Sequence, residues 1–385
     1  MFDWVHYHFP SRLFFEMDST HKIGSMVRDL GKRVLIVTVR EENTNPDQLA
    51  VIKTSLEKYT SGCIIYDDFS PNPIHEEIDT AAHFTKQCNA DIIMAYGARN
   101  SLSAAKAIAL LARNEIFAND LRNSSFPLKK KALPLVTVPT YPAMGEECTP
   151  SFYIHEPETK TNFYAQDPNL YPELIFLDPN ITLGISSNEM ANYGAAALSA
   201  CIEAILSKKA NEISNSIALR GIELIARNLM SLVNEPNNHA ARMGVFMSSV
   251  FAGMAHSNSR LGLTYSIASA AVNLTNLDFY RVNSILLPHI MEYNLTTSAG
   301  KYVQIARALE EDIADITVIE AAIKAVEGVR KLFMELKLPQ RLSDFEIEKS
   351  ELPAIADQAY NIPMTRNTPR EMDKNEIETI LIAAY

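Results

Sequence analysis

Short apolar runs alternate with helical patterns along the first half of the chain. The runs are rich in branched residues, which favours strands at 33–38, 63–66, 91–96, 135–138 and 174–178. Between them, apolar residues recur with the period of an α-helix at 45–59, 76–88 and 103–113. This alternation predicts βαβ units and a mostly parallel sheet, in which ligands bind beyond the carboxyl ends of the strands.

The pattern changes near Pro179. From about Ile181 onward almost every segment has helical periodicity, and helices are expected at 187–208, 211–232, 237–257, 261–273, 280–294, 299–310, 315–335 and 374–383. No linker rich in Gly or Ser separates the halves. The sequence therefore predicts an α/β domain over 1–181 and an all-helical domain over 182–385, with a cleft between them.

Composition and charge disfavour some binding partners and indicate a cellular compartment. The 385 residues carry a formal net charge of −11, which disfavours nucleic acid and anionic membranes as partners. No apolar run reaches the length of a membrane span, and the first residues lack the pattern of a signal peptide. The four cysteines are far apart, so neither a disulfide framework nor a zinc site is indicated and a reducing cytoplasm is expected.

Several motifs follow one another in an order typical of a known family. They are GKRVLIVT (31–38), FSPNP (69–73), DIIMAYGARNSLSAAKAIALL (91–111), VPTYPAMGEECTPS (138–151), FLDPNITLGIS (176–186), LSACIEA (198–204), SILLPHIMEYN (284–294) and the ending from 367 to 385. Over nearly its whole length the chain resembles the iron-containing (group III) alcohol dehydrogenases. The resemblance implies a Rossmann-like nucleotide-binding domain, a helical metal-binding domain, NAD(P)-linked chemistry on alcohols or aldehydes, and a homodimer.

The resemblance also identifies where the family's metal ligands should lie. Family members hold a divalent metal with one Asp and three His, and the corresponding positions here are Ala196, Ala200, Tyr265 and Phe279. A further family histidine corresponds to Ser269. Alanine and phenylalanine have no donor atom, and tyrosine binds Fe or Zn well only as phenolate. We therefore expect no catalytic metal.

The phosphate-binding turn has changed as well. The family has Gly-Gly-Gly-Ser there, so that backbone N–H groups at a helix N-terminus can approach the pyrophosphate. This chain has Gly97, Ala98, Arg99 and Asn100. Arg99 either neutralises a phosphate or fills the pocket with its own side chain, and the sequence leaves both possibilities open.

The resemblance implies a set of residues around the cofactor, if any dinucleotide binds. Val39 and Arg40 replace the acidic residue that prefers NAD, which favours NADP(H). Glu146 stands where the family has Ser and adds a negative charge beside a pyrophosphate. Lys106 and Lys160 either neutralise phosphate or are ordinary exposed lysines. The expected cofactor-binding residues are Gly97, Arg99, Asn100, Ser103, Lys106, Thr140, Thr149, Lys160 and Arg40.

These observations leave alternative functions. The first is a metal-independent NAD(P)H-linked oxidoreductase acting on a small alcohol or aldehyde in the interdomain cleft. Tyr265 would stabilise the alkoxide, assisted by Ser199 and Ser269. The second is a non-catalytic pseudoenzyme with a binding or scaffold role, in which Tyr265 and Phe279 only fill the volume of the lost metal site. The third keeps the fold and the cleft but binds a different ligand, such as a sugar phosphate or small carboxylate, near Arg99, Lys106 and Lys160.

Overall fold

The computed structural model describes residues 6–42, 45–122, 130–275 and 277–385. The chain forms two compact units. The sheet unit contains Phe9–Tyr141 and Glu146–Ile185. The helical unit contains Ser186–Tyr385, the short segment Pro142–Gly145, and the N-terminal stretch that ends at His8. The segment Pro142–Gly145 thus belongs to the helical unit although residues of the sheet unit flank it on both sides.

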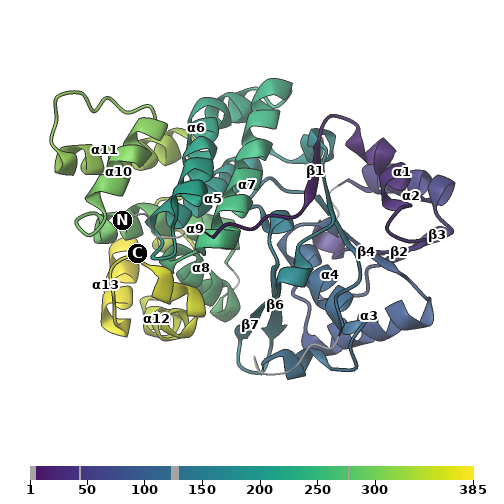
Figure 1. The fold of residues 1–385 in the computed structure, drawn as a ribbon. Helices are drawn as coiled ribbons and strands as arrows, with labels where there is room; N and C mark the ends of the chain where they lie inside the picture. Colours follow the sequence, from purple (N-terminus) through teal and green to yellow (C-terminus); the bar gives the residue numbers. More distant parts are fainter. Residues whose placement is uncertain (1–5, 43–44, 123–129, 276) are drawn as a thin grey trace. The chain divides into compact units, whose positions relative to one another are not determined.

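A six-stranded sheet, parallel throughout, forms the centre of the sheet unit (Figure 1). The strand order is β1-β8-β5-β4-β2-β3. A separate antiparallel hairpin pairs β6 with β7. The predicted parallel sheet is confirmed, and β1 and the hairpin are strands that the pattern did not indicate. The strands are β1 Arg12–Phe15, β2 Arg33–Val37, β3 Gly62–Tyr66, β4 Ile92–Gly97, β5 Leu135–Pro139, β6 Ser151–Glu156, β7 Thr161–Gln166 and β8 Leu174–Leu177.

Helices cover both faces of this sheet, because alternate strand residues enter two different cores. One core contains Leu35 and Val37 of β2, and the other contains Val34 and Ile36. The helices of the unit are α1 Ile23–Val27, α2 Pro46–Tyr59, α3 His75–Gln87 and α4 Arg99–Leu111.

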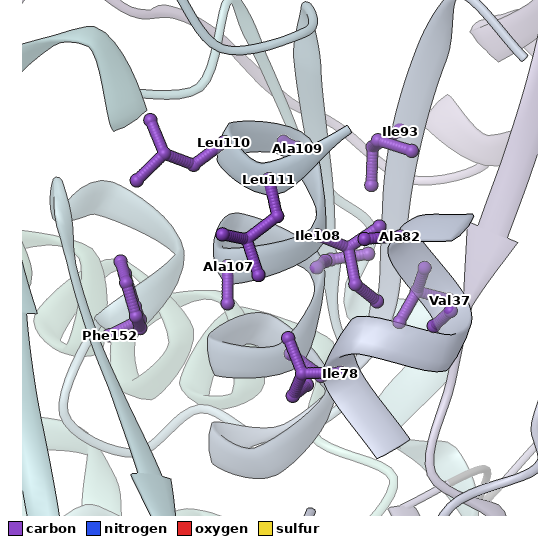
Figure 2. Close-up of a cluster of buried hydrophobic side chains, with 14 of the residues drawn as sticks. Val37, Ile78, Ala82, Ile93, Ala107, Ile108, Ala109, Leu110, Leu111 and Phe152 are labelled. Carbon is purple, nitrogen blue, oxygen red and sulfur yellow. The ribbon is translucent and has the colours of Figure 1, made fainter. Parts of the chain in front are cut away.

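Helix α4 lies inside the first core and is buried along its whole length. Figure 2 shows Ile108 of α4 close to Ala82 of α3 and to strand residues such as Val37. Phe152 of β6 packs into the same core. Burying a helix on all sides fixes its position firmly, so the turn at its N-terminus is held in place by the core behind it.

The helical unit confirms the predicted change to all-α structure (Figure 1). Side-chain caps begin many of these helices, such as the capping box of Ser186 with Glu189 before α5. Helix α12, which has a proline in its first turn, was not predicted. Of the described helices, none is long and apolar enough to cross a membrane. The helices of the helical unit are α5 Ser187–Leu206, α6 Glu212–Asn234, α7 His239–Ser259, α8 Leu263–Leu274, α9 Phe279–Asn294, α10 Ala299–Ala308, α11 Val318–Glu335, α12 Leu352–Asn361 and α13 Lys374–Ala384.

Candidate cofactor and metal sites

The turn between β4 and α4 is the place where the sequence predicts phosphate binding. Strand β4 ends at Gly97, and α4 begins at Arg99 after the N-cap residue Ala98. Gly97 has a φ of 152°, and a Cβ atom there would lie 2.2 Å from Ser101 Oγ. Only glycine is compatible with this turn. Ala98 supplies no side-chain cap, so the first N–H groups of α4 need another acceptor.

That acceptor is the side chain of Glu42, at the end of the 3₁₀ turn Arg40–Glu42 that follows β2. Its Oε2 atom accepts hydrogen bonds from Ala98 N at 2.9 Å and Ser101 N at 2.8 Å. Its Oε1 atom accepts from Asn100 N at 2.8 Å. The backbone N–H groups expected to receive pyrophosphate are therefore bonded to a carboxylate of the chain itself.

Glu42 is buried, with 7% of its surface exposed. Burial raises the pKa of its carboxyl group, and the hydrogen bonds from Ser101, Asn100 and Ala98 oppose this by favouring the ionised form. Thr140, an expected cofactor-binding residue, donates its hydroxyl to the Glu42 carbonyl at 3.0 Å. Glu42 was not among the residues expected from the sequence. Its position shortly after β2 was the only feature that indicated a place near the α4 turn.

Arg99 and Asn100 both contact Tyr153 of β6. The Arg99 guanidinium lies 4.1 Å from the centre of the Tyr153 ring, a cation–π arrangement. The Tyr153 hydroxyl donates to Asn100 Oδ1, and Asn100 Nδ2 donates to Pro71 O at 2.9 Å. Ser103 Oγ accepts from Tyr153 N at 3.4 Å. In this arrangement the Arg99 side chain packs against an aromatic ring of its own unit.

Lys106 is also engaged within the sheet unit. It is 1% exposed, and its ammonium group donates to Glu146 O at 2.7 Å, Thr149 Oγ1 at 3.1 Å and Ser151 O at 3.0 Å. Burial lowers the pKa of Lys106 to about 8. Burial likewise raises the pKa of its neighbour Glu147 to about 8. Lys106 thus holds the segment that leads into β6.

Two further expected cofactor residues lie at the surface of the sheet unit. Arg40 forms an exposed ion pair with Asp67, with 2.9 Å between Nε and Oδ2. Lys160 lies in the turn between β6 and β7 with a positive φ of 50°. Of the expected cofactor residues, the structure therefore brings those of the α4 turn together with Thr140, through Glu42. Arg40 instead pairs with Asp67, directly after β3.

In the helical unit, all four positions assigned to metal ligands are buried. Ala196 and Ala200 lie one turn apart on α5, and both are fully buried. Tyr265 of α8 and Phe279 of α9 meet edge to face, with 5.5 Å between ring centres. Phe279 also contacts Tyr280, 5.4 Å away in the same geometry. This donor set does not fit Fe²⁺ or Zn²⁺. Across the described residues, no group of three or more His, Cys, Asp or Glu is placed to hold a metal ion.

Glu203 fixes the helix that carries Tyr265. Its buried carboxylate accepts hydrogen bonds from Gly262 N at 3.2 Å, Thr264 N at 2.6 Å and Tyr265 N at 3.4 Å. It therefore caps α8 much as Glu42 caps α4. Ser199 of α5 and Ser269 of α8 are buried within the same unit. In the described part of the chain, Ser199 Oγ has no hydrogen-bond partner.

Comparison with known families accounts for this architecture. Residues 10–179 match the family model of iron-containing alcohol dehydrogenase, and residues 190–385 match that of the C-terminal domain of the Fe-containing alcohol dehydrogenase family. The chain belongs to the iron-containing alcohol dehydrogenase family.

Named oxidoreductases are similar to most or all of the chain. A 1,3-propanediol dehydrogenase from Klebsiella pneumoniae is 29% identical over 390 residues, covering 100% of this chain and 99% of that protein. Lactaldehyde reductase from Escherichia coli K12 is 29% identical over 323 residues, covering 83% of this chain and 84% of that protein. The crystal structure of a 1,3-propanediol oxidoreductase has a TM-score of 0.94 and 27% identity, with 100% of both chains covered. The family is thus one of oxidoreductases.

Proposed function

We propose that this chain is a non-catalytic member of the iron-containing alcohol dehydrogenase family, with a binding role in place of metal-dependent hydride transfer. The proposal rests on one observation. The four positions that correspond to metal ligands hold two buried alanines and the edge-to-face pair of Tyr265 and Phe279. The family's metal would act as the Lewis acid that stabilises an alkoxide, and these residues offer it no imidazole or carboxylate.

The same replacements also favour a filled core. A buried divalent ion without carboxylate or imidazole ligands is very costly, because no group at these positions compensates its charge. Aromatic side chains bury about 150–250 Å² each and gain further from edge-to-face contact. Tyr265 and Phe279 are each only 6% exposed. This burial supports the interpretation that Tyr265 and Phe279 fill the volume of a lost metal site.

Metal content tests this proposal directly. The purified chain, loaded anaerobically with Fe²⁺ or Zn²⁺ and then dialysed, should retain no stoichiometric metal by inductively coupled plasma mass spectrometry. The matched variant carries Ala196→Asp, Ala200→His, Tyr265→His and Phe279→His together, which supplies the family's donor types at the same positions. That variant should retain metal. One equivalent of Fe or Zn in the wild-type chain would sink the proposal, whether or not the variant folds.

A second candidate is a metal-independent NADPH-linked reductase of a small aldehyde. Ser199 favours it, because its buried hydroxyl has no hydrogen-bond partner within the described residues and can donate to an incoming oxygen. Tyr265 would then be the main donor to the alkoxide. Turnover of NADPH with a panel of aldehydes separates the two candidates. Activity that Tyr265→Phe abolishes would establish the reductase, and no turnover supports the non-catalytic role.

A further inference from the structure

We propose that the Glu42 carboxylate is an internal substitute for the pyrophosphate of a dinucleotide. In this arrangement the α4 turn is closed to nicotinamide cofactors for as long as Glu42 occupies it. The inference concerns the sheet unit alone and does not depend on whether the helical unit binds metal.

The geometry of the turn supports this assignment. Ala98, Asn100 and Ser101 direct their N–H groups at the two oxygens of one carboxylate, at 2.8–2.9 Å. Those distances are typical of charge-assisted hydrogen bonds. Free N–H groups and the positive end of the helix dipole are the features that bind phosphate at a helix N-terminus. A carboxylate held here satisfies the same donors with the same sign of charge.

The backbone of Glu42 is held in place independently of its carboxylate. Glu42 N donates to Val39 O at 2.9 Å, and Thr140 Oγ1 donates to Glu42 O at 3.0 Å. Ser101 Oγ accepts from Val39 N at 2.8 Å, which ties the end of β2 to the first turn of α4. An anion tethered so closely competes with a diffusing one at a high effective concentration.

The nearby cations are engaged elsewhere and cannot readily offset a second anion. The Arg99 guanidinium lies over the Tyr153 ring, and the Lys106 ammonium is bonded to three oxygen acceptors. A dinucleotide entering the turn would have to displace the Glu42 carboxylate and then lie beside it. Repulsion between these like charges in a buried turn further disfavours the dinucleotide.

The test compares NADH and NADPH binding to the wild-type chain, Glu42→Gln and Glu42→Ala by isothermal titration calorimetry. Glu42→Gln keeps the shape and removes the charge, and Glu42→Ala also vacates the space. We expect no binding to the wild-type chain at millimolar cofactor and at least about tenfold tighter binding to both variants. Glu41→Ala is the matched control, because Glu41 is exposed and its loss changes the net charge equally. This control should remain like the wild-type chain.

Two results would overturn the inference. One is micromolar binding of either cofactor to the wild-type chain. The other is no gain in binding by variants whose circular dichroism shows that they are folded. If neither variant folds, the wild-type titration alone decides, since absence of binding supports the inference and binding contradicts it. Metal content is measured separately, so the outcome here is distinguishable from failure of the proposed function.

Discussion

A buried ionisable side chain takes its role from the groups that surround it, as Lys106 and Glu147 illustrate. The sequence leaves Lys106 as either a phosphate-binding or an exposed lysine, whereas in the structure its ammonium group is buried and bonded to two carbonyl oxygens and a hydroxyl. Glu147 is 1% exposed beside it, and burial raises the pKa of its carboxyl to about 8. Such a group makes the stability of the sheet unit depend on pH.

The sign of this dependence follows from the two pKa values of Glu147. The folded chain keeps the Glu147 proton up to about pH 8, whereas the unfolded chain releases it near the ordinary glutamate value of about 4.3. Stability from this proton is complete below the unfolded value and is lost as the pH rises through the folded value. We expect the wild-type free energy of unfolding to fall between pH 5 and pH 8, measured by urea denaturation.

The variant Glu147→Gln is the control for this slope. Its amide has no proton to release, so its stability should change less between pH 5 and pH 8 than that of the wild-type chain. Any pH dependence of the unfolding free energy that remains in this variant comes from the other ionisable groups. Equal slopes in the two proteins would show that Glu147 is already ionised in the folded chain at pH 5.

At the residue scale, the family resemblance assigns positions to the metal ligands, and that assignment stays a prediction, whereas nothing in the sequence singled out Glu42. With Ile202 and Glu203 fixing the register, the family resemblance implies that Ala196 and Ala200 stand at two of the ligand positions. The contact between Glu42 and Ala98 joins residues 56 positions apart. Hydrophobic periodicity reports which face of an element is buried, but it does not report which side chain reaches a distant helix terminus.

Elements with a long periodic pattern, a clear cap or a continuous apolar run were predictable, and elements without these signals were not. Helix α11 combines strong amphipathicity with the capping box of Thr317 and Glu320, and it forms where the pattern indicated. Strand β1 begins with Arg12 and contains no β-branched residue, whereas β8, of the same length, is a continuous apolar run that includes Ile175. The hairpin of β6 and β7 mixes aromatic, polar and charged residues without a regular pattern. Its sequence therefore resembled a loop.

Helix α7 depends on one close contact with a neighbouring segment of its unit. A Cβ atom on Gly253 would lie 2.0 Å from Gly145 O, and Gly145 itself has a φ of 76°. We expect Gly253→Ala to lower the free energy of unfolding by about 1–3 kcal/mol, the usual cost of overpacking. Urea denaturation followed by circular dichroism measures this change.

The matched control is Gly300→Ala in α10. A Cβ atom there meets nothing within 4 Å, and alanine favours a helix over glycine by about 0.5–1 kcal/mol. Gly300→Ala should therefore be as stable as the wild-type chain or slightly more stable. If the two variants have equal stability, the contact between Gly253 and Gly145 is not as tight as the distances indicate.

At the scale of the whole molecule, each unit contains one fully buried cysteine. Cys148 belongs to the sheet unit and Cys201 to the helical unit, and both have 0% exposed surface. Cys63 and Cys88 are partly exposed, and all four thiols are free. Burial raises the pKa of both buried thiols, so their reactive thiolate forms are scarce in the folded chain.

Thiol titration with Ellman's reagent follows from this distribution. All four cysteines should react in guanidinium chloride, whereas Cys148 and Cys201 should remain protected in the native chain. Mass spectrometry of labelled peptides then shows which unit opens first as denaturant is added. Prompt labelling of either buried thiol without denaturant would contradict the packing described for its unit.

The short segment Pro142–Gly145 has a consequence for biosynthesis. It emerges from the ribosome within the sequence of the sheet unit, but it packs in the helical unit, where His256 Nε2 lies 2.9 Å from Met144 O. Its packing partners on α7 are translated about a hundred residues later. A nascent chain that stops at Ile185 thus carries four residues without their native neighbours, and a fragment that starts at Ser186 lacks them altogether. The native packing of Pro142–Gly145 therefore has to wait for the C-terminal half of the chain.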